Sequence, residues 1–531
     1  MRGTGPIPLG LLAAALLVPG PAVLGAQSTQ SRWRSEDRVV IGDYSRISSV
    51  AVGQTEVYLS TPESVALWNP GFQEWKGPYQ PPTLDYLAGV FEALVDPLDN
   101  SLWMARSSGW VHFQETIQLW DRGTAPGRVQ AIAFDRANPG AGLFLRTTNG
   151  WFVVGIGSGV AQPSRPPADP EFPVTPEQAL RQLPTLRSNS AAILRTPGLG
   201  TARYSAAAEA FDRQGWYVGT WGAGLLYLPT GAALPERVPF GLRGNVARSL
   251  FRDPRGVWVA TNQTATAPAA ITLVRSDLGS FFTLTGSPAF GLRYHQSADM
   301  VGNGEDLWVA TDIGAVRVPT GGGSIEVFDE TRGLPDRRAL SLAAYRGNVY
   351  VGSQRGMVRI DDSLHVSPVA PGFFGRAWAL ALSPDTVWVA TNLGIRYALE
   401  DSDVLLEPGA LRASPGFQVP VRDLAWKADT LVGLTRDEML WRDPESGGWT
   451  LGPNLSGLLG RLYRMALWRD GFWVAGERGV VWAGVGGSGQ ALLRVGEDLP
   501  GVPFDLVVQG QYLWVGTNAG VVRWTLDAIR P

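Results

Sequence analysis

Short apolar segments with strand-like patterning recur along the whole chain. One short phrase recurs eleven times between Tyr58 and Trp514: a branched apolar residue and then, in most copies, an aromatic residue, a small residue and a hydroxyl. The clearest copies are 257–261 (VWVAT), 307–311 (LWVAT), 387–391 (VWVAT) and 513–517 (LWVGT), and neighbouring copies are most often about 41 residues apart. A repeat of this period, built from strand-like phrases, is typical of a β-propeller in which each repeat forms one blade.

The repeat around Trp388 shows how one blade is expected to be built. Residues 376–382 are an apolar run without polar alternation after its start, as in a strand buried on both faces. Residues 387–391 and 395–397 form the second and third predicted strands, and a weaker fourth lies near 404–406. The pattern therefore predicts an all-β chain of about eleven four-stranded blade repeats.

Each phrase has one aromatic position, which we call the aromatic marker. Its occupants are Tyr58, Trp103, Phe144, Tyr217, Trp258, Trp308, Tyr350, Trp388, Val432, Trp473 and Trp514. We expect these side chains to be buried between neighbouring blades, where each contributes about 1.5–3 kcal/mol. A glycine recurs in the turn after the phrase, and we expect a positive φ there; its copies are Gly150, Gly314, Gly356, Gly394, Gly479 and Gly520.

The last copy resembles a known repeat. Leu-Trp-Val-Gly-Thr at 513–517, a turn containing glycine and then Val-Val-Arg at 521–523 are similar to the two-component regulator propeller repeat. That repeat carries a Gly-Leu-Pro signature before its innermost strand, which matches Gly333, Leu334 and Pro335, with variants at 241–242, 291–292 and 498–500. The resemblance covers most of residues 45–525 and implies a propeller fold outside the cytoplasm.

In that family such blades usually form periplasmic sensor halves of hybrid histidine kinases, often as two rings of seven. This chain departs from the pattern in having about eleven units and in showing no membrane helix or kinase segment after the last one. The resemblance therefore supports the fold and the location more than a signalling task.

Spacing along the chain predicts how the blades are organised. A Pro-rich insertion covers about 161–203, and within it Thr175, Pro176 and Gln178 predict a short helix that ends near Pro184. An unassigned strand at 38–41 precedes the first unit, and pairing it with the last blade would close a ring. We expect two rings of five to seven blades, with one ring nested in the sequence of the other; the alternative is one large ring.

The N-terminal segment and the composition bear on location. Residues 1–26 have the pattern of a signal peptide, with Arg2 before an apolar stretch of about ten residues that is too short to span a bilayer. The region 27–531 is then the propeller, and the protein is expected to be periplasmic or secreted, without an integral membrane span. A formal charge of −3 argues against a nucleic-acid partner, and 0 cysteines exclude disulfides and thiolate chemistry.

Candidate binding residues lie in the loops that enter the innermost strands, which share one face around the channel of a propeller. Arg338, Arg376 and Arg461 occupy one register, twelve residues before their aromatic markers, and Arg243, Arg293 and Arg422 lie near it. Converging guanidinium groups could bind carboxylates, sulfates or phosphates, although such arginines can also bridge blades or face solvent. Aromatic residues accompany them and could stack on a ligand or pack between blades: Phe290, Tyr294, Phe373, Phe374, Phe417 and Tyr463, with Trp221 expected to be the most exposed.

Catalytic signals are weak. His112, His295 and His365 lie in different units without metal-type spacing, and only His295 lies in a channel-face loop. The acidic clusters 361–362 and 400–403 are interpreted as turn charges, and no catalytic residue, metal or cofactor is predicted. The sequence predicts an exported non-enzymatic module that binds a glycan, peptide or partner protein. The alternatives are a structural component of an envelope or secretion assembly, and a polysaccharide lyase or hydrolase that would begin from His295 and Tyr294.

Overall fold

The computed structural model of the chain describes residues 34, 37–155, 157–196, 200–285, 294–399, 403–409, 419–427, 429–443, 445–484 and 490–529. Ser35–Pro531 form one compact unit. The predicted signal peptide, 1–26, lies outside the described residues. No helix in the described part of the chain is both long and apolar enough to cross a membrane.

The fold is all-β, as predicted. Eleven antiparallel sheets are stacked as blades, and in nine of them the described residues form four strands. The sheet β33–β35 has three strands, and a single bridge between Tyr397 and Leu406 stands where the weak fourth strand was expected.

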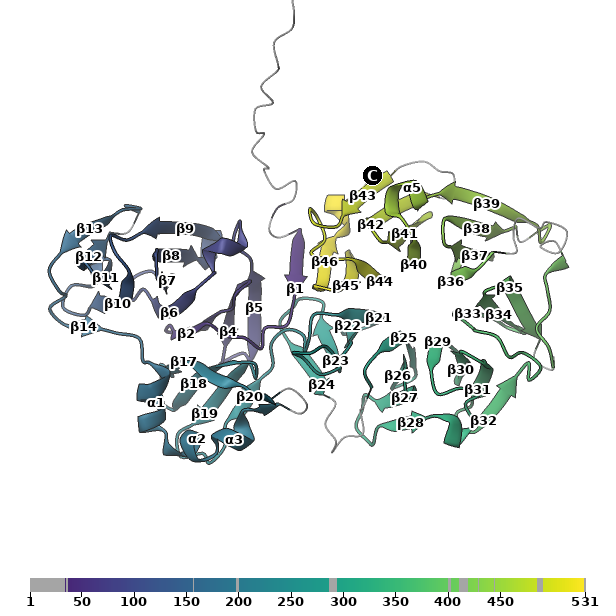
Figure 1. Ribbon diagram of the computed structural model, residues 1–531, viewed down its shortest axis with the longest axis horizontal. Helices are drawn as coiled ribbons and strands as arrows, with labels where there is room; N and C mark the ends of the chain where they lie inside the picture. The colour runs from purple at the N-terminus through teal and green to yellow at the C-terminus, as the bar shows by residue number, and fades with distance from the viewer. Residues whose placement is uncertain are drawn as a thin grey trace, which may run out of the picture. The chain divides into compact units, whose positions relative to one another are not determined.

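Seven sheets follow one another in a closed cycle (Figure 1). Their innermost strands contact each other in the order β21, β25, β29, β33, β36, β40 and β44, and β44 contacts β21 again. We call this group the seven-sheet cycle. Its strands are β21 (Ala247–Asp253), β22 (Gly256–Thr261), β23 (Ala270–Arg275) and β24 (Phe281–Thr285); β25 (Ser297–Asn303), β26 (Asp306–Thr311), β27 (Gly314–Pro319) and β28 (Glu326–Phe328); β29 (Ala339–Tyr345), β30 (Asn348–Ser353), β31 (Gly356–Ile360) and β32 (Val366–Val369); β33 (Ala379–Ser383), β34 (Thr386–Thr391) and β35 (Gly394–Leu399); β36 (Val421–Lys427), β37 (Thr430–Thr435), β38 (Glu438–Arg442) and β39 (Trp449–Asn454); β40 (Leu462–Trp468), β41 (Gly471–Gly476), β42 (Gly479–Gly484) and β43 (Gln490–Arg494); β44 (Pro503–Gln509), β45 (Tyr512–Thr517) and β46 (Gly520–Thr525).

The seventh sheet is completed from far away in the sequence. Strand β1 (Arg38–Ile41) pairs antiparallel with β46, with Arg38 opposite Trp524 and Ile41 opposite Val521. The predicted pairing of 38–41 with the last blade is thus confirmed. The four remaining sheets lie, in sequence, between β1 and β21.

We call these remaining sheets the four-sheet series. Contacts join them in the order β10, β6, β2 and β17, named by their innermost strands. Their strands are β2 (Ser49–Val52), β3 (Val57–Ser60), β4 (Val65–Asn69) and β5 (Glu74–Tyr79); β6 (Val90–Val95), β7 (Leu102–Arg106), β8 (Gly109–Gln114) and β9 (Leu119–Thr124); β10 (Val129–Asp135), β11 (Leu143–Thr147), β12 (Gly150–Val154), β13 (Ala161–Ser164) and β14 (Pro170–Glu171); β17 (Arg203–Glu209), β18 (Gly215–Trp221), β19 (Leu225–Pro229) and β20 (Glu236–Val238).

The insertion covers a sheet face in the four-sheet series. Helix α1 (Pro176–Gln182) begins at the predicted capping box, in which Thr175 caps the Gln178 N–H and the Gln178 side chain caps the Thr175 N–H. Two further helices, α2 (Pro184–Ser188) and α3 (Ser190–Ile193), were not predicted, because Pro184 starts a helix as well as ending one. Leu186 packs against Val218 and Leu226 of the last sheet of the series. The small sheet β15 (Arg195–Thr196) and β16 (Gly200–Thr201) follows, and the predicted start at 161 falls instead on β13.

The aromatic markers are the cores of the blades, as predicted. Nine of the ten aromatic ones are buried and Tyr350 is half-buried. Trp388, for example, packs in one cluster with Val421 and Leu424 of the next innermost strand. Neighbouring blades are therefore joined through these side chains.

The hydroxyl at the end of the phrase closes the following turn, as the copies at 307–311, 387–391 and 513–517 show. The Thr311 hydroxyl donates to the Gly314 carbonyl (2.8 Å) and accepts the Ile313 N–H (3.2 Å), and Thr391 and Thr517 repeat the bond to the glycine carbonyl. Gly314 has a φ of 132°, and a Cβ there would lie 2.1 Å from the Phe328 carbonyl oxygen. Positive φ values occur at all six predicted glycines. The hydroxyl and the glycine thus recur because the turn needs both.

We predict that Trp388→Ala lowers the free energy of unfolding by about 3–5 kcal/mol, since the change leaves a cavity between two blades. Thermal and urea denaturation measure the loss. Phe374→Ala is the control, because Phe374 is 79% exposed and its removal should change little. A Trp388→Ala variant as stable as the wild type would contradict the assignment of this indole to a blade core.

Candidate anion-binding site at the mouth of the seven-sheet cycle

The loops that enter the innermost strands lie beside the turns between second and third strands. The Trp378 indole donates to Asn392 Oδ1 (2.8 Å), and the Val502 N–H donates to Asn518 Oδ1 (2.9 Å). These bonds place both kinds of loop on one face of the seven-sheet cycle. We call the opening that they surround the channel mouth.

Three of the predicted site residues are exposed in these entry loops. Arg338 donates to Gln296 Oε1 (3.1 Å), and Arg461 lies 3.9 Å from the Glu477 carboxylate. Arg376 lies with its guanidinium carbon 5.4 Å from the centre of the Trp378 ring. None of the three forms an ion pair with a neighbouring blade among the described residues.

The guanidinium groups of two arginines, Arg376 and Arg422, lie over the ring of Trp378 and come from neighbouring blades. The guanidinium of Arg422, on β36, lies 4.6 Å from the same ring that Arg376 approaches. Burial lowers the pKa of Arg422, and the charges of Arg461, Arg376 and Arg436 lower it further. Guanidinium groups from β33–β35, β36–β39 and β40–β43 therefore act on one another at the mouth.

Arg248 and Arg338 extend the positive charge around the channel. Burial lowers the pKa of Arg248, on β21, and the charges of Arg464 and Arg338 act in the same direction, whereas the Asp505 carboxylate opposes them. Arg248 also stacks on Phe504, with 4.6 Å between its guanidinium carbon and the ring centre. No Asp or Glu of the described residues lies within 4.0 Å of Arg248, Arg338, Arg376 or Arg422. We call these four residues and Arg461 the mouth arginines.

The other predicted site residues lie elsewhere or are engaged. Arg293, like Phe290 and Phe417, lies outside the described residues. His295 is exposed and its Nδ1 lies 3.1 Å from Asp312 Oδ2. Trp221, expected to be the most exposed aromatic, is half-buried at the end of β18 in the four-sheet series, with Arg203 over its ring at 5.8 Å. Arg243 donates to the Ala223 carbonyl at 3.4 Å.

The residues from which a catalytic centre could have started are not free. Tyr294 is buried, and its hydroxyl donates to the Ala270 carbonyl (2.8 Å). His112 is buried against the Trp103 ring with Nε2 2.8 Å from Ser101 Oγ. Asp361 accepts the N–H groups of Ser363 and His365, as a turn residue does. Within the described ranges, no three His, Asp or Glu side chains gather as metal ligands would.

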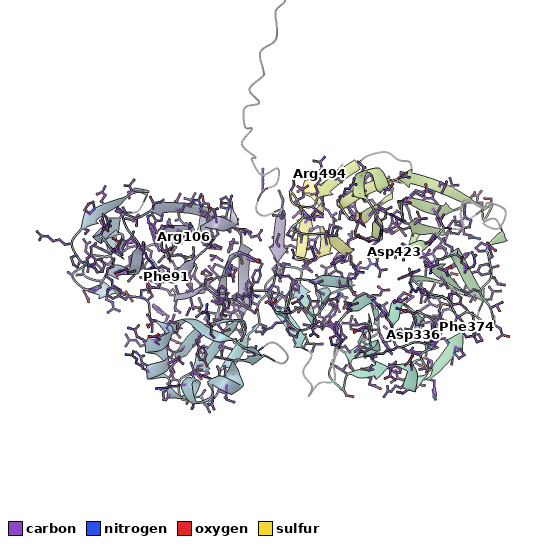
Figure 2. All side chains as sticks on the ribbon, in the orientation of Figure 1. Phe91, Arg106, Asp336, Phe374, Asp423 and Arg494 are labelled. Carbon is purple, nitrogen blue, oxygen red and sulfur yellow. The ribbon has the colours of Figure 1, made fainter. Side chains whose placement is uncertain are left out.

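Below the mouth, one arginine crosses the channel. Arg464, on β40, pairs with Asp423 on the neighbouring β36 (3.2 Å) and with Asp299 on β25 (3.6 Å), and it donates to the Ala298 carbonyl (2.9 Å). Strand β25 is not a neighbour of β40 in the cycle, so the side chain reaches across the axis. Figure 2 shows Asp423 on the inner side of the cycle, with Phe374 farther out.

The carboxylates around Arg464 also join neighbouring blades. Asp299, Asp423 and Asp505 each accept a backbone N–H from the innermost strand of the next sheet, at Leu342 (2.9 Å), Met465 (2.8 Å) and Leu250 (2.7 Å). These N–H groups lie beside the β-bulges at the start of the strands. The carboxylates therefore satisfy donors that the bulged ladder leaves unpaired.

Burial sets the protonation of this network. It raises the pKa of Asp505 to about 7, against the opposing effect of Arg464, and it raises the pKa of Asp299 and Asp423. The three carboxylates in turn raise the pKa of Arg464 although burial opposes the charged form. The channel thus holds one guanidinium among three carboxyl groups with raised pKa values, of which that of Asp505 is about 7.

The sequence contained a signal for this network that was missed. Asp299, Asp423, Arg464 and Asp505 each lie nine residues before their aromatic marker, in strands that are otherwise apolar. Arg248 and Arg422 lie ten residues before theirs, the position that Trp378 also occupies. A charge at a fixed place in an apolar repeat indicates a shared location, even though partners across the channel cannot be read from it.

Comparisons with known proteins concern the fold. No family model and no curated protein matches the chain. It is similar to the extracellular domain of BT4673 from B. thetaiotaomicron, assigned to a one-component system, with 13% identity and a TM-score of 0.45; the match covers 91% of this chain and 65% of that one. The chain therefore spans less than two thirds of that domain.

Two further structures are similar at the same level. PorZ, a surface component of the type-IX secretion system of Porphyromonas gingivalis, has 12% identity and a TM-score of 0.45, with 90% of this chain and 74% of that one covered. Virginiamycin B lyase from Staphylococcus aureus has 14% identity and a TM-score of 0.42, with 54% and 98% covered. At these sequence identities, the functions of these proteins cannot be assigned to this chain. The resemblance to the two-component regulator propeller repeat therefore stays a prediction.

We predict that Arg464→Ala destabilises the protein by about 3–5 kcal/mol at pH 8, because it leaves buried carboxylates without their cation. Chemical denaturation measures the loss, and Arg461→Ala, an exposed change, should cost less than about 0.5 kcal/mol. Equal stability of the two variants would show that the crossing arginine does not hold the cycle together.

We also predict that stability falls as pH rises between about 4 and 7. The folded protein keeps a proton on Asp505 up to about pH 7, whereas the unfolded chain releases it near 3.8. The folded state therefore binds more protons in this window, and raising the pH favours unfolding. Burial raises the pKa of Glu92 to about 7 as well, so Asp505→Asn should flatten part of the slope of melting temperature against pH, and Asp505→Asn with Glu92→Gln should flatten more. A slope unchanged in both variants would contradict this protonation.

Proposed function

We propose that the protein is an exported recognition module that binds an anionic ligand at the channel mouth. The predicted signal peptide supports export. The observation that carries the binding is the set of four arginines, on four different sheets, without a carboxylate within 4.0 Å among the described residues.

Unpaired cations that repel one another favour an anion between them. The guanidinium of Arg422 is opposed by three others, and an anionic ligand would relieve this repulsion while accepting bidentate hydrogen bonds. Trp378, Tyr463 and Phe504 stand ten residues before their markers, beside the arginines, and offer rings on which a sugar or peptide could stack. An anionic glycan or an acidic peptide fits this combination.

Binding rather than turnover is the activity that the described mouth supports. Tyr294, one of the two residues from which catalysis could begin, is unavailable because its hydroxyl is bonded to the main chain. A recognition role needs only the charge and the rings.

We predict that the mature chain binds a sulfated glycan such as heparin, and that Arg376→Ala with Arg422→Ala weakens binding at least about tenfold, because each charged hydrogen bond contributes about 1.5–3 kcal/mol. Isothermal titration calorimetry measures the affinity, which should fall as salt is raised. Arg252→Ala is the matched control, since Arg252 is an exposed arginine near the other end of β21. Binding that is absent, or equally strong in the double variant, would overturn the proposal.

A further inference from the structure

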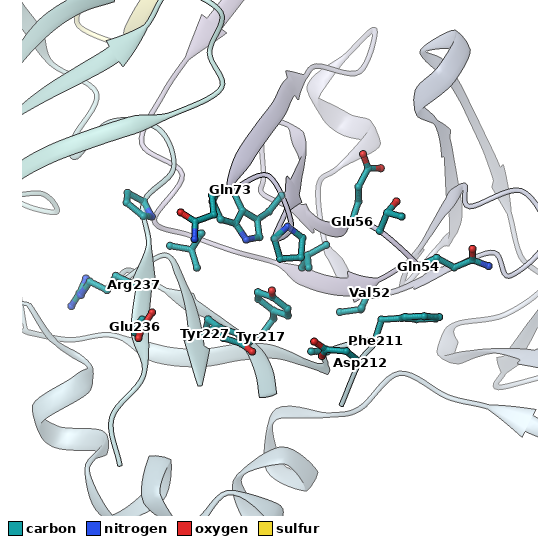
Figure 3. A pocket seen from close by; sticks show the side chains of 18 residues that line it. Val52, Gln54, Glu56, Gln73, Phe211, Asp212, Tyr217, Tyr227, Glu236 and Arg237 are labelled. Atoms are coloured by element: carbon teal, nitrogen blue, oxygen red, sulfur yellow. The ribbon is translucent and has the colours of Figure 1, made fainter. Parts of the chain in front are cut away.

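A second cavity lies in the four-sheet series, away from the mouth arginines. It has a volume of about 540 Å³ and lies between the sheets β2–β5 and β17–β20 (Figure 3). That volume is within the range of small-ligand sites, about 300–1,000 Å³. The loop between β2 and β3, the loop between β17 and β18, and strand β20 supply most of its lining. We call it the inter-sheet groove.

Aromatic side chains from both sheets line the groove. Tyr217 and Tyr227 lie with ring centres 4.8 Å apart, Trp68 faces them from β4, and Phe211 is 66% exposed at the rim. The cavity thus has an exposed ring at its rim and further aromatic side chains along its wall, which is the mixed apolar lining of a small-ligand site.

The free charges in the groove are negative. Asp212 and Glu236 are exposed and, in the described part of the chain, neither lies within 4.0 Å of a Lys or Arg nitrogen. Burial raises the pKa of the Tyr227 hydroxyl, and the negative charges of Asp212 and Glu236 raise it further. Figure 3 shows the two tyrosines between Phe211 and Asp212 on one side and Glu236 on the other.

The remaining charged groups of the lining are already engaged. Glu56 is 6% exposed and pairs with Lys76 (2.5 Å). The Arg237 guanidinium donates to the Ala223 carbonyl (3.2 Å), in the turn at the far end of β18. The groove therefore offers two carboxylates without a cationic partner among the described residues, although Asp212 also accepts the Gln214 N–H (2.9 Å), together with aromatic side chains.

We propose that the inter-sheet groove binds an alkylammonium group, held between Asp212 and Glu236 and against the faces of Phe211 and Tyr227, with the buried Tyr217 packed behind Tyr227. Cations are attracted to aromatic faces and to carboxylates alike, and methylene groups pack on Val52 and Val238 of the lining. The ammonium could belong to a free polyamine or to the lysine side chain of a peptide. This site is opposite in charge to the channel mouth and does not depend on it.

The test is calorimetric titration of the mature chain with spermidine, with an end-capped Gly-Lys-Gly-Lys peptide and with maltose as a neutral ligand. We expect saturable binding of at least one cation with a dissociation constant below about 1 mM, weakening with salt. Asp212→Asn with Glu236→Gln should weaken it at least about tenfold. Phe211→Ala should weaken it about threefold. These residues are exposed, so unchanged melting temperatures confirm that the variants fold.

Two controls separate this site from other effects. Asp385→Asn with Glu445→Gln removes two exposed carboxylates from the seven-sheet cycle and should leave the affinity unchanged. Arg376→Ala should also leave it unchanged, so failure of the anion site and failure of the groove are distinguishable. Tighter binding of spermidine assigns the groove to free polyamines, and tighter binding of the peptide assigns it to lysine. Absence of cation binding, an affinity unaffected by the double variant, or binding of maltose alone would overturn the proposal.

Discussion

The pairing of β1 with β46 is the constraint on which the rest of the structure depends. It brings residues 38–41 to the last sheet of the chain, where they supply the fourth, outermost strand of the blade that lies between β40–β43 and β21–β24 in the seven-sheet cycle. Each blade buries its aromatic marker against the next, and a cycle lets every blade do so on both faces. The mouth exists because seven innermost strands are kept around one axis.

The same closure brings opposite charges into the channel. Arg464 can reach Asp299 only because β25 and β40 lie across the axis from each other. The carboxylates that hold Arg464 also bind the N–H groups of the neighbouring blade, so one set of side chains joins adjacent sheets and fills the channel. The mouth arginines lie near this network, and all of them except Arg461, which is 3.9 Å from Glu477, have no carboxylate within 4.0 Å among the described residues. The four-sheet series presents the reverse, with unpaired carboxylates beside rings.

Local features of the fold and the pairing of 38–41 with the last blade could be predicted from the sequence, whereas contacts across the channel and between sheets could not. The phrase around Trp388, the positive φ of Gly314 and the capping box at Thr175 follow from short-range chemistry that the residues display directly. Trp221 was misjudged because Arg203 on the adjacent strand covers its ring, and strand neighbours of this kind depend on register.

Of the two candidate sites, the channel mouth could be predicted from the sequence and the inter-sheet groove could not. A fixed register predicted Arg338, Arg376 and Arg461, because a repeat places equivalent positions on one face. The groove combines Val52 with Phe211, which lie far apart in the sequence and share no pattern, so only the packing of two sheets reveals it. Charge and aromatic rings define the chemical class of ligand that each site could bind. Binding measurements are needed to identify the particular ligand.

Hydrogen–deuterium exchange of the native protein tests the closure of the seven-sheet cycle most directly. The account predicts that the amides of Val39 and Ile41 are protected to the same degree as those of β46 and lose protection together with them. Rapid exchange of β1, with β44 to β46 still protected, would show that the cycle holds without that strand and would contradict the account.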